Sequence, residues 1–248
     1  MSGLVVAARY LTIVPLPGRP HGGAEELGGA APWFPVVGLG IGVVLVATER
    51  VTTLLFPALL AALLTVTVWK VVTGGIHLDG LADCLDGLTG RDPTQRLAIM
   101  SDSRIGAFGA LGLIFFLLLE IAAVAELAPA SRWRALVAAP AIARAMPALV
   151  GRVFPAARPH GHGAGFRLGL RARSAVLALV VAAAVAVLAL GVVGGVALAV
   201  AGLAALGVGR FMAGRLQGMT GDVLGASVEV AELAALLTVS AWAHARLT

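Results

Sequence analysis

The chain of 248 residues has few of the charged side chains that normally cover a soluble protein. Charged residues make up 12% of it, and only 13 residues are acidic, whereas about a quarter of an average soluble domain is charged. Hydrophobic residues make up 59%, and the mean hydropathy is +0.97. This composition excludes an ordinary soluble domain and predicts helices that lie in a lipid bilayer.

Cysteine is almost absent, and the chain has no obvious internal repeat. Cys84 is the single cysteine, so an intramolecular disulfide is excluded. We expect Cys84 to be a small packing residue rather than a reactive thiol. Apart from a bias toward Ala, Val and Leu, no segment is of low complexity, and we predict a single membrane-embedded catalytic domain over residues 1–248.

Several apolar runs approach the roughly 20 residues needed to cross a bilayer. They predict an all-α, polytopic integral membrane protein with about seven transmembrane helices. The run 174–209 is too long for one helix, and its glycines indicate a hairpin. The segment 4–14 is too short to span, contains Arg9, and is expected to form an interfacial helix. The predicted spans are residues 33–48, 51–69, 107–125, 135–151, 174–190, 195–209 and 226–243.

The basic residues predict the orientation, because they concentrate on cytoplasmic loops. With the N-terminus inside, 13 basic residues fall on the cytoplasmic side and four outside, while Arg144 lies within a span. This bias and anionic lipid headgroups explain the net charge of +5, so we do not expect nucleic-acid binding. The inside group is Arg9, Arg19, Lys70, Arg91, Arg96, Arg104, Arg152, Arg158, Arg167, Arg171, Arg173, Arg210 and Arg215; the outside group is Arg50, Arg132, Arg134 and Arg246.

The first polar segment, residues 74–88, reads GGIHLDGLADCLDGL. On a helix, Asp79, Asp83 and Asp86 lie within about 60° of one another on one face. Three such carboxylates repel one another unless a cation neutralises them, and hard oxygen ligands suit Mg²⁺ or Mn²⁺. The alternative is a solvated acidic face. His77 lies roughly opposite the carboxylates, which favours a packing or capping role over a direct one.

The second polar segment, residues 96–109, reads RLAIMSDSRIGAFG and directly precedes a span. Asp102 could add a metal ligand, and Arg104 could hold a phosphate through its planar fork. Alternatively, Arg104 contacts lipid headgroups, and Asp102 or Ser103 caps the next helix. In the loop 152–173, five arginines with His160 and His162 suit an anionic ligand, although the topology already explains most of the arginines. We do not expect the two histidines to bind a metal.

The third polar segment, residues 214–232, reads GRLQGMTGDVLGASVEVAE. Its acids Asp222, Glu229 and Glu232 enter a span, where a carboxylate costs several kcal/mol unless it is paired, protonated or bound to a cation. They are therefore functional candidates. Gly221 would allow close approach of a phosphate or of a neighbouring helix. Glu120 stands alone toward the outer end of its span and is expected to face the interface or to pair with Arg144.

Together these segments resemble the cobalamin synthase family, also called the adenosylcobinamide-GDP ribazoletransferases. FPVVG at 34–38 resembles the family's FPLVG element, and GGIHLDGLADCLDG at 74–87 resembles its GGxHLDGLADxxDG signature. RLAIMSDSRIGAFG resembles RxxIMxDSRxGxxG, and TGDVLGASVEVAE at 220–232 resembles TGDxxGAxxExxE. The four elements occur in the family's order over about 200 residues. The loop 152–166 departs from the family pattern at Phe154 and at its histidines.

The resemblance implies an enzyme of the final steps of cobalamin biosynthesis. A ribose hydroxyl of α-ribazole, or of its 5′-phosphate, would attack the phosphate of adenosylcobinamide-GDP next to the corrinoid arm, and GMP would leave. Together with the apolar runs and the distribution of basic residues, this function predicts a multi-pass protein of the cell membrane whose active site faces the cytoplasm.

The same comparison suggests roles for individual residues. Asp83 or Asp222 would accept the hydroxyl proton, with His77 as the alternative base, and Arg104 would bind phosphate. The expected Mg²⁺ ligands are Asp79, Asp83, Asp86 and Asp102. The expected substrate-binding residues are Ser103, Arg104, Arg158, Gly221, Asp222 and Glu229.

Two other functions fit part of the pattern. A CDP-alcohol phosphotransferase has a motif that opens D-x-x-D-G, as residues 83–87 with Arg91 do, but the closing G-x-x-x-D-x-x-x-D is missing. An ion-coupled transporter would distribute charges along its spans at mid-depth. Here the charged motifs cluster at one membrane face, which favours an enzyme.

Overall fold

The computed structural model describes residues 2–16 and 23–245. In these ranges the chain is helical, with one isolated β-bridge between Ala156 and Met219. This confirms the predicted all-α class. The helices are α1 (Gly3–Leu11), α2 (Ala24–Ala30), the short 3₁₀ helix η1 (Ala31–Trp33), α3 (Phe34–Leu55), α4 (Ala58–Val72), α5 (Ile76–Gly87), α6 (Pro93–Ile99), α7 (Ala107–Glu126), α8 (Pro129–Val153), α9 (His162–Gly169), α10 (Ala172–Leu190), α11 (Val192–Leu216) and α12 (Gly221–His244).

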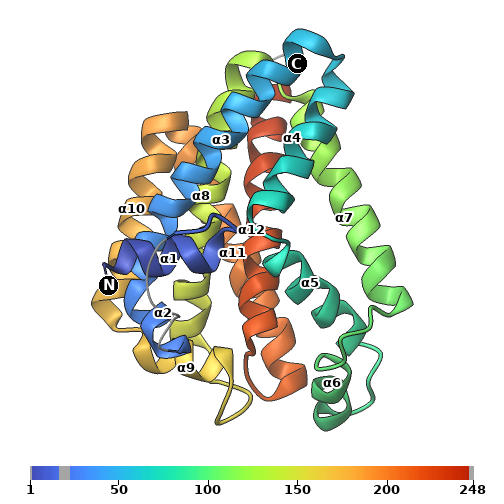
Figure 1. The fold of residues 1–248 in the computed structure, drawn as a ribbon, viewed down its shortest axis with the longest axis vertical. Coiled ribbons are helices and arrows are strands. Elements are labelled where there is room, and N and C mark those ends of the chain that lie inside the picture. The colour runs from blue at the N-terminus through green and yellow to red at the C-terminus, as the bar shows by residue number, and fades with distance from the viewer. Residues whose placement is uncertain (1, 17–22, 246–248) are drawn as a thin grey trace.

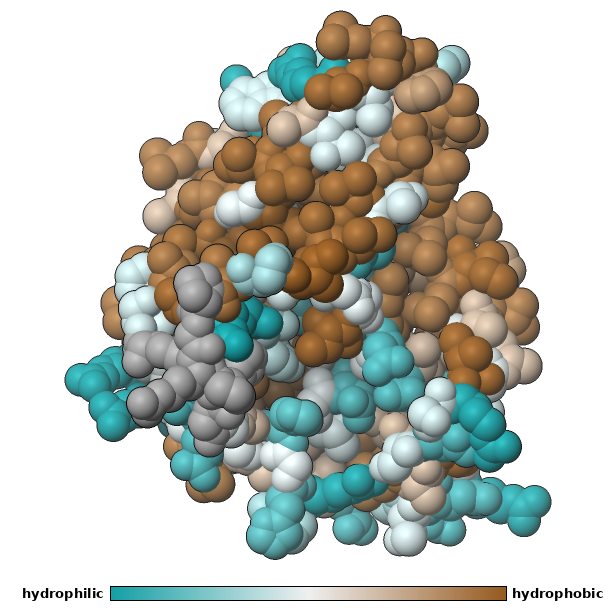
Figure 2. All heavy atoms as spheres, viewed as in Figure 1, coloured by the Kyte–Doolittle hydropathy of each residue, from teal (hydrophilic) through white to brown (hydrophobic). Residues whose placement is uncertain are grey.

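The long helices have the length and the surface of a polytopic membrane protein. Six helical segments of the described chain are long and apolar enough to cross a bilayer, and the α4–α5 pair raises the number to seven if it counts as one span. Apolar side chains cover most of the face seen in Figure 2, while hydrophilic ones gather at its lower end. The prediction of about seven transmembrane helices is confirmed.

Helix α12 runs through the centre of the molecule (Figure 1). It packs against α11 and α8 on one side and against α5 and α7 on the other. The α3 and α10 helices complete the first group around α8, and α4 joins α7 in the second. The helices α5, α6 and α9, which carry or adjoin the polar segments, lie toward the same end of the molecule (Figure 1).

The break between the first two long helices differs from the prediction. We expected a loop between 48 and 51, but α3 continues to Leu55, and the turn falls at Phe56 and Pro57. Pro57 lacks an N–H group and disfavours helical geometry at the residue before it, which explains the position of the turn. Glu49, in the expected loop, is instead buried and accepts a hydrogen bond from Arg132 of α8 at 3.2 Å.

Arg132 was predicted to lie in an outside loop, whereas it is a buried residue in the first turns of α8. It also donates hydrogen bonds to the backbone oxygens of Ala125 and Leu127 at the end of α7. These contacts satisfy carbonyl groups that a helix end leaves unpaired. Of the other residues predicted outside, Arg50 lies in the last turns of α3 and Arg134 in the first turns of α8. Arg246 lies outside the described residues, as does Arg19 of the predicted inside group.

A sharp bend separates α4 from α5. The two helix axes meet at 91°, and the link contains Gly74 and Gly75, whose φ angles are +63° and +65°. Glycine adopts this left-handed conformation without a steric penalty. The bend turns the aspartate-bearing α5 away from the direction of α4 and leads it down toward the polar end of the molecule (Figure 1).

Small residues bring the helices around α8 and α12 close together. Gly42 of α3 faces the backbone of α8, where an added Cβ would lie 2.8 Å from the Leu136 oxygen and from the Val137 Cα atom. Alanines spaced four residues apart form fully buried stripes: Ala178, Ala182 and Ala186 on α10, and Ala197, Ala201 and Ala205 on α11. Such surfaces allow close van der Waals packing within a membrane.

We predict that Gly42→Ala destabilises the protein while Gly40→Ala does not. The first change forces the backbones of α3 and α8 apart, and overpacking of this kind typically costs about 1–3 kcal/mol. An added Cβ at Gly40, on the same helix, would meet nothing within 4 Å. The midpoint of thermal unfolding in detergent measures the difference; equal midpoints for the two variants would contradict the assigned packing.

Candidate functional site

The first cleft lies between α5 and the loop that joins α6 to α7. Its volume is about 670 Å³. Asp79 and Asp83 line it from α5, and the loop contributes Asp102, Ser103 and Arg104. Among the described residues, neither Asp79 nor Asp83 has an ion-pair partner within 4.0 Å. The cleft therefore offers two uncompensated carboxylates and a third on the loop.

On the loop, Asp102 and Arg104 pair with each other. The Nη2 atom of Arg104 donates to Oδ2 of Asp102 at 2.6 Å, and its Nε atom donates to Oδ1 at 3.0 Å. The hydrogen bonds from Arg104 lower the pKa of the Asp102 carboxyl group to about 2. Both side chains are solvent-accessible, and that of Arg104 is 87% exposed. Both groups can therefore meet a ligand that enters the first cleft.

The third aspartate of α5, Asp86, binds the start of α7 instead of facing the first cleft. Its two carboxylate oxygens accept hydrogen bonds from the backbone N–H groups of Gly106 at 2.7 Å and Gly109 at 2.8 Å, in the first turn of α7. A carboxylate at a helix N-terminus satisfies unpaired N–H groups and interacts favourably with the helix dipole. Asp86 is buried and does not line the first cleft. Its contacts favour anchoring α7 over the predicted metal binding.

The second cleft, of about 250 Å³, lies beside the first. The two share Met100 and Ser101 as lining residues. Arg158 and His160 line the second cleft from the loop after α8, and His162 lines it from the start of α9. Thr220, Gly221 and Asp222 line it from the start of α12. The structure thus brings together parts of the three polar segments and of the arginine-rich loop.

Close packing of α5 on α12 sets the distance between the two clefts. A Cβ added to Gly80 would lie 2.8 Å from the backbone oxygen of Asp222, so no larger residue fits there. Asp79 and Asp83 are consequently near enough to Asp222 for their negative charges to repel one another. The Thr220 hydroxyl group donates to Asp222 at 3.1 Å and accepts the N–H of Val223, which caps α12.

Backbone contacts hold the arginine-rich loop over the second cleft. The N–H of Ala157 donates to the oxygen of Met219 at 2.9 Å, and the N–H of Met219 donates to Pro155 at 2.8 Å. Arg158 donates to the backbone oxygen of Leu97 at 2.6 Å and to the Ser101 hydroxyl group at 3.1 Å. Arg158 therefore bridges this loop to α6 as well as lining the cleft, a contact that the sequence did not indicate.

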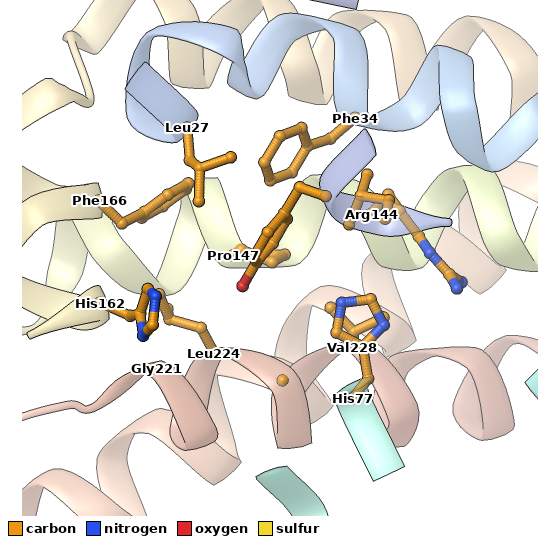
Figure 3. A pocket seen from close by; sticks show the side chains of 13 residues that line it. Leu27, Phe34, His77, Arg144, Pro147, His162, Phe166, Gly221, Leu224 and Val228 are labelled. Atoms are coloured by element: carbon orange, nitrogen blue, oxygen red, sulfur yellow. The ribbon is translucent and has the colours of Figure 1, made fainter. Parts of the chain in front are cut away.

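His77 does not line the first cleft with Asp79 and Asp83; it lies where α5 packs on α12, and a Cβ added to Gly225 would be 3.4 Å from its Cα atom. It is buried and lines a small cavity of about 20 Å³, which is room for about one water molecule. Figure 3 shows its imidazole ring and the Arg144 guanidinium group on the same side of this cavity. The cavity shares His162 and Gly221 with the second cleft, but the burial of His77 and the small size of the cavity favour the packing role.

Glu229 and Glu232 do not reach the clefts. They point into the bundle, where the Lys70 ammonium group donates to Glu229 at 2.7 Å, to Glu120 at 2.9 Å and to Glu232 at 3.1 Å. Arg144 of α8 forms an ion pair with Glu232. We call these five residues the buried charge cluster.

Two predictions fail at the buried charge cluster. Lys70 was placed on the cytoplasmic side, and Glu120 was expected to face the interface or to pair with Arg144; instead the two bind each other inside the protein. The missed signal is a lysine that directly follows a mostly apolar segment, residues 58–69, in which Thr65 and Thr67 are the polar residues. Such a charge needs a buried partner, and the sequence does not identify which acid supplies it.

Over the described ranges, Glu120, Glu229 and Glu232 are the one trio of acidic, His or Cys side chains whose ligand atoms all lie within 4.8 Å of one another. The Lys70 ammonium group contacts all three carboxylates and so takes the place among them that a metal ion would need. Asp79, Asp83 and Asp102 line one cleft without converging to that distance.

We predict that Asp86→Asn lowers stability, because the amide that replaces one oxygen cannot accept an N–H. The loss of a hydrogen bond to a charged group, with a buried donor left unpaired, costs about 1–3 kcal/mol. Asp79→Asn is the matched control, since Asp79 has no hydrogen bond of this kind. Thermal unfolding in detergent separates the two, and an unchanged midpoint for Asp86→Asn would remove its anchoring role.

Comparison with known proteins gives one consistent result. The family model described as cobalamin-5-phosphate synthase matches residues 3–240. An adenosylcobinamide-GDP ribazoletransferase of Brevibacillus brevis is 36% identical over 98% of this chain and 99% of its own length. Relatives of the same name from Roseiflexus sp. and Geotalea daltonii are 39% and 35% identical, over 97% and 95% of this chain and 90% and 96% of theirs. No solved structure matches the chain.

Proposed function

The chain belongs to the cobalamin-5-phosphate synthase family, and we propose that it is an adenosylcobinamide-GDP ribazoletransferase that acts at the two clefts. A ribose hydroxyl group of α-ribazole, or of its 5′-phosphate, attacks the phosphorus next to the corrinoid arm. The bond between that phosphorus and the oxygen bridging to GMP breaks. The hydroxyl proton is lost, GMP leaves, and the product is adenosylcobalamin or its 5′-phosphate.

The observation that carries this proposal is the junction of two clefts at Met100 and Ser101. A reaction between two large substrates requires two adjoining binding sites, so that the reacting groups of the bound substrates can meet. The first cleft, with three carboxylates and Arg104, suits the pyrophosphate together with a cation. The second, lined by Arg158, His160 and His162, suits the acceptor nucleoside and its phosphate when present.

The carboxylates of the first cleft are the proposed Mg²⁺ ligands. Asp79 and Asp83 are uncompensated hard oxygen donors on one helical face, and Asp102 lies across the cleft from them. Mg²⁺ bound there would neutralise the charge that builds up on the pyrophosphate oxygens. Asp86 supports this group indirectly, since it anchors α7 directly after the loop that carries Asp102 and Arg104.

Protein side chains supply orientation and take up the proton. Arg104 binds a phosphate oxygen in exchange for part of its pairing with Asp102, and Ser103 lines the same cleft. Asp222 lines the second cleft and is the proposed base for the ribose hydroxyl group, with Asp83 as the alternative if it does not bind metal. The Gly221 backbone lies at the N-terminus of α12, a suitable place for an anion.

The proposed location is the cell membrane, with both clefts facing the cytoplasm. The end of the molecule that carries the clefts also carries most of the basic residues between long helices, including Arg91, Arg96 and Arg158. Basic residues concentrate on the cytoplasmic side of membrane proteins. Soluble, charged substrates would then reach both clefts without crossing the bilayer.

Family membership separates the chain from the two other functions. The CDP-alcohol phosphotransferase pattern was already incomplete. The transporter argument needs a correction, because the structure does contain charges deep in the bundle, at the buried charge cluster. These charges are paired with one another, and the relatives that match over almost their whole length are transferases.

The proposal predicts a defined turnover. The purified protein in detergent, supplied with adenosylcobinamide-GDP, α-ribazole and Mg²⁺, should form GMP and completed corrinoid in equal amounts. Replacing α-ribazole by its 5′-phosphate tests which acceptor is used, and CDP-activated lipid with an alcohol is the negative control. Folded protein that forms no GMP with either acceptor would refute the assignment.

We further predict that Asp83→Asn lowers turnover about a hundredfold or more without unfolding the protein. The change removes either a metal ligand or a base, and loss of a positioned base alone costs a factor of about 10²–10⁴. Glu25→Gln, which removes an exposed charge on α2, is the control. Rates near the wild-type value over a Mg²⁺ titration would exclude Asp83 from the site.

A further inference from the structure

The buried charge cluster has one more acid than it has cations. Glu120, Glu229 and Glu232 would contribute three negative charges, and Lys70 and Arg144 contribute two positive ones. The three glutamate side chains and Arg144 are at most 1% exposed, and Lys70 is 11% exposed. A net charge buried among apolar helices is costly, and buried groups avoid this cost by binding a proton or a counterion.

The cations that could balance the extra charge are already in use. Lys70 has three N–H donors, and each of them reaches a different carboxylate. Arg144 pairs with the remaining oxygen of Glu232. His77 of α5 lines a cavity together with Arg144, but its burial and the nearby charges of Arg144 and Lys70 oppose a third positive charge there.

The three glutamates are not equivalent. Glu232 contacts both cations, and Glu229 has the shortest contact with Lys70, at 2.7 Å. Glu120 has one contact, at 2.9 Å, and its second oxygen is buried without a hydrogen-bond partner. The negative charge is therefore least compensated on Glu120.

We propose that Glu120 carries a proton in the folded protein, so that the cluster is a buried proton-binding site with no net charge. The proton resides on the Oε2 atom, which has no partner, while Oε1 continues to accept the hydrogen bond from Lys70. Two carboxylates then face two cations. This inference does not depend on the proposed enzymatic function, because its test measures the carboxyl group itself.

Infrared spectroscopy of the detergent-solubilised protein at neutral pH tests the proposal. A protonated carboxyl group has a carbonyl stretch that an ionised carboxylate lacks, and the band shifts in heavy water. We expect the wild-type band to be absent from Glu120→Gln. Glu49→Gln is the matched control. Glu49 is also buried, but its carboxylate faces two cations, Arg132 at 3.2 Å and Arg50 at 3.9 Å, and should be ionised, so this variant should keep the band.

Stability gives a second readout. Glutamine resembles a protonated glutamate in shape and charge, so Glu120→Gln should change the midpoint of thermal unfolding by less than about 2 °C, which is at most about 1 kcal/mol for a chain of this size. Glu49→Gln leaves Arg132 buried without its counterion and should lower the midpoint by more.

A wild-type spectrum without a protonated glutamate band would overturn the proposal, as would a band that persists in folded Glu120→Gln. If Glu120→Gln does not fold, wild-type protein with ¹³C in its glutamate carboxyl groups provides the same test: a band that shifts on labelling supports the proposal, and the lack of one refutes it.

Discussion

The approach of α5 to α12 is the constraint on which the site depends. Gly80 lets the two backbones come so close that Asp79 and Asp83 on one helix and Asp222 on the other belong to one region. Charge repulsion among these acids works against this close approach. The packing of α5 against α7 and α6 holds α5 in place despite the repulsion. The bend at Gly74 and Gly75 gives α5 the direction that makes this crossing possible.

The molecule has two clusters of acidic side chains, and the repulsion between their negative charges is compensated in a different way in each. In the buried charge cluster, two cations from α4 and α8 and the proposed proton on Glu120 balance the glutamates of α7 and α12. In the first cleft, Asp79 and Asp83 have no such partners within the described chain. The negative charges of the first cleft are therefore left without counterions inside the protein, and a cation that arrives with the substrate can bind there.

Much of this arrangement could be predicted from the sequence, but only for features that depend on a single segment of the chain. Apolar runs predicted the class and most spans, and helical spacing separated His77 from Asp79 and Asp83, which line a different cavity. The turn at Pro57 was misplaced because Glu49 looked like a loop residue, and only its contact with Arg132 of α8 explains its burial. The partners of Lys70 and Asp86 lie on other helices, so spacing along one segment could not reveal them.

The contacts of Lys70 also constrain how the protein is made. Lys70 is synthesised 50 residues before Glu120 and 159 and 162 residues before Glu229 and Glu232. If helices enter the bilayer in chain order, its ammonium group first meets one glutamate and obtains the other two only with the last helix. Because α12 also carries Asp222, the same insertion step completes both the charge balance of the interior and the second cleft. A chain that ends before α12 would lack both.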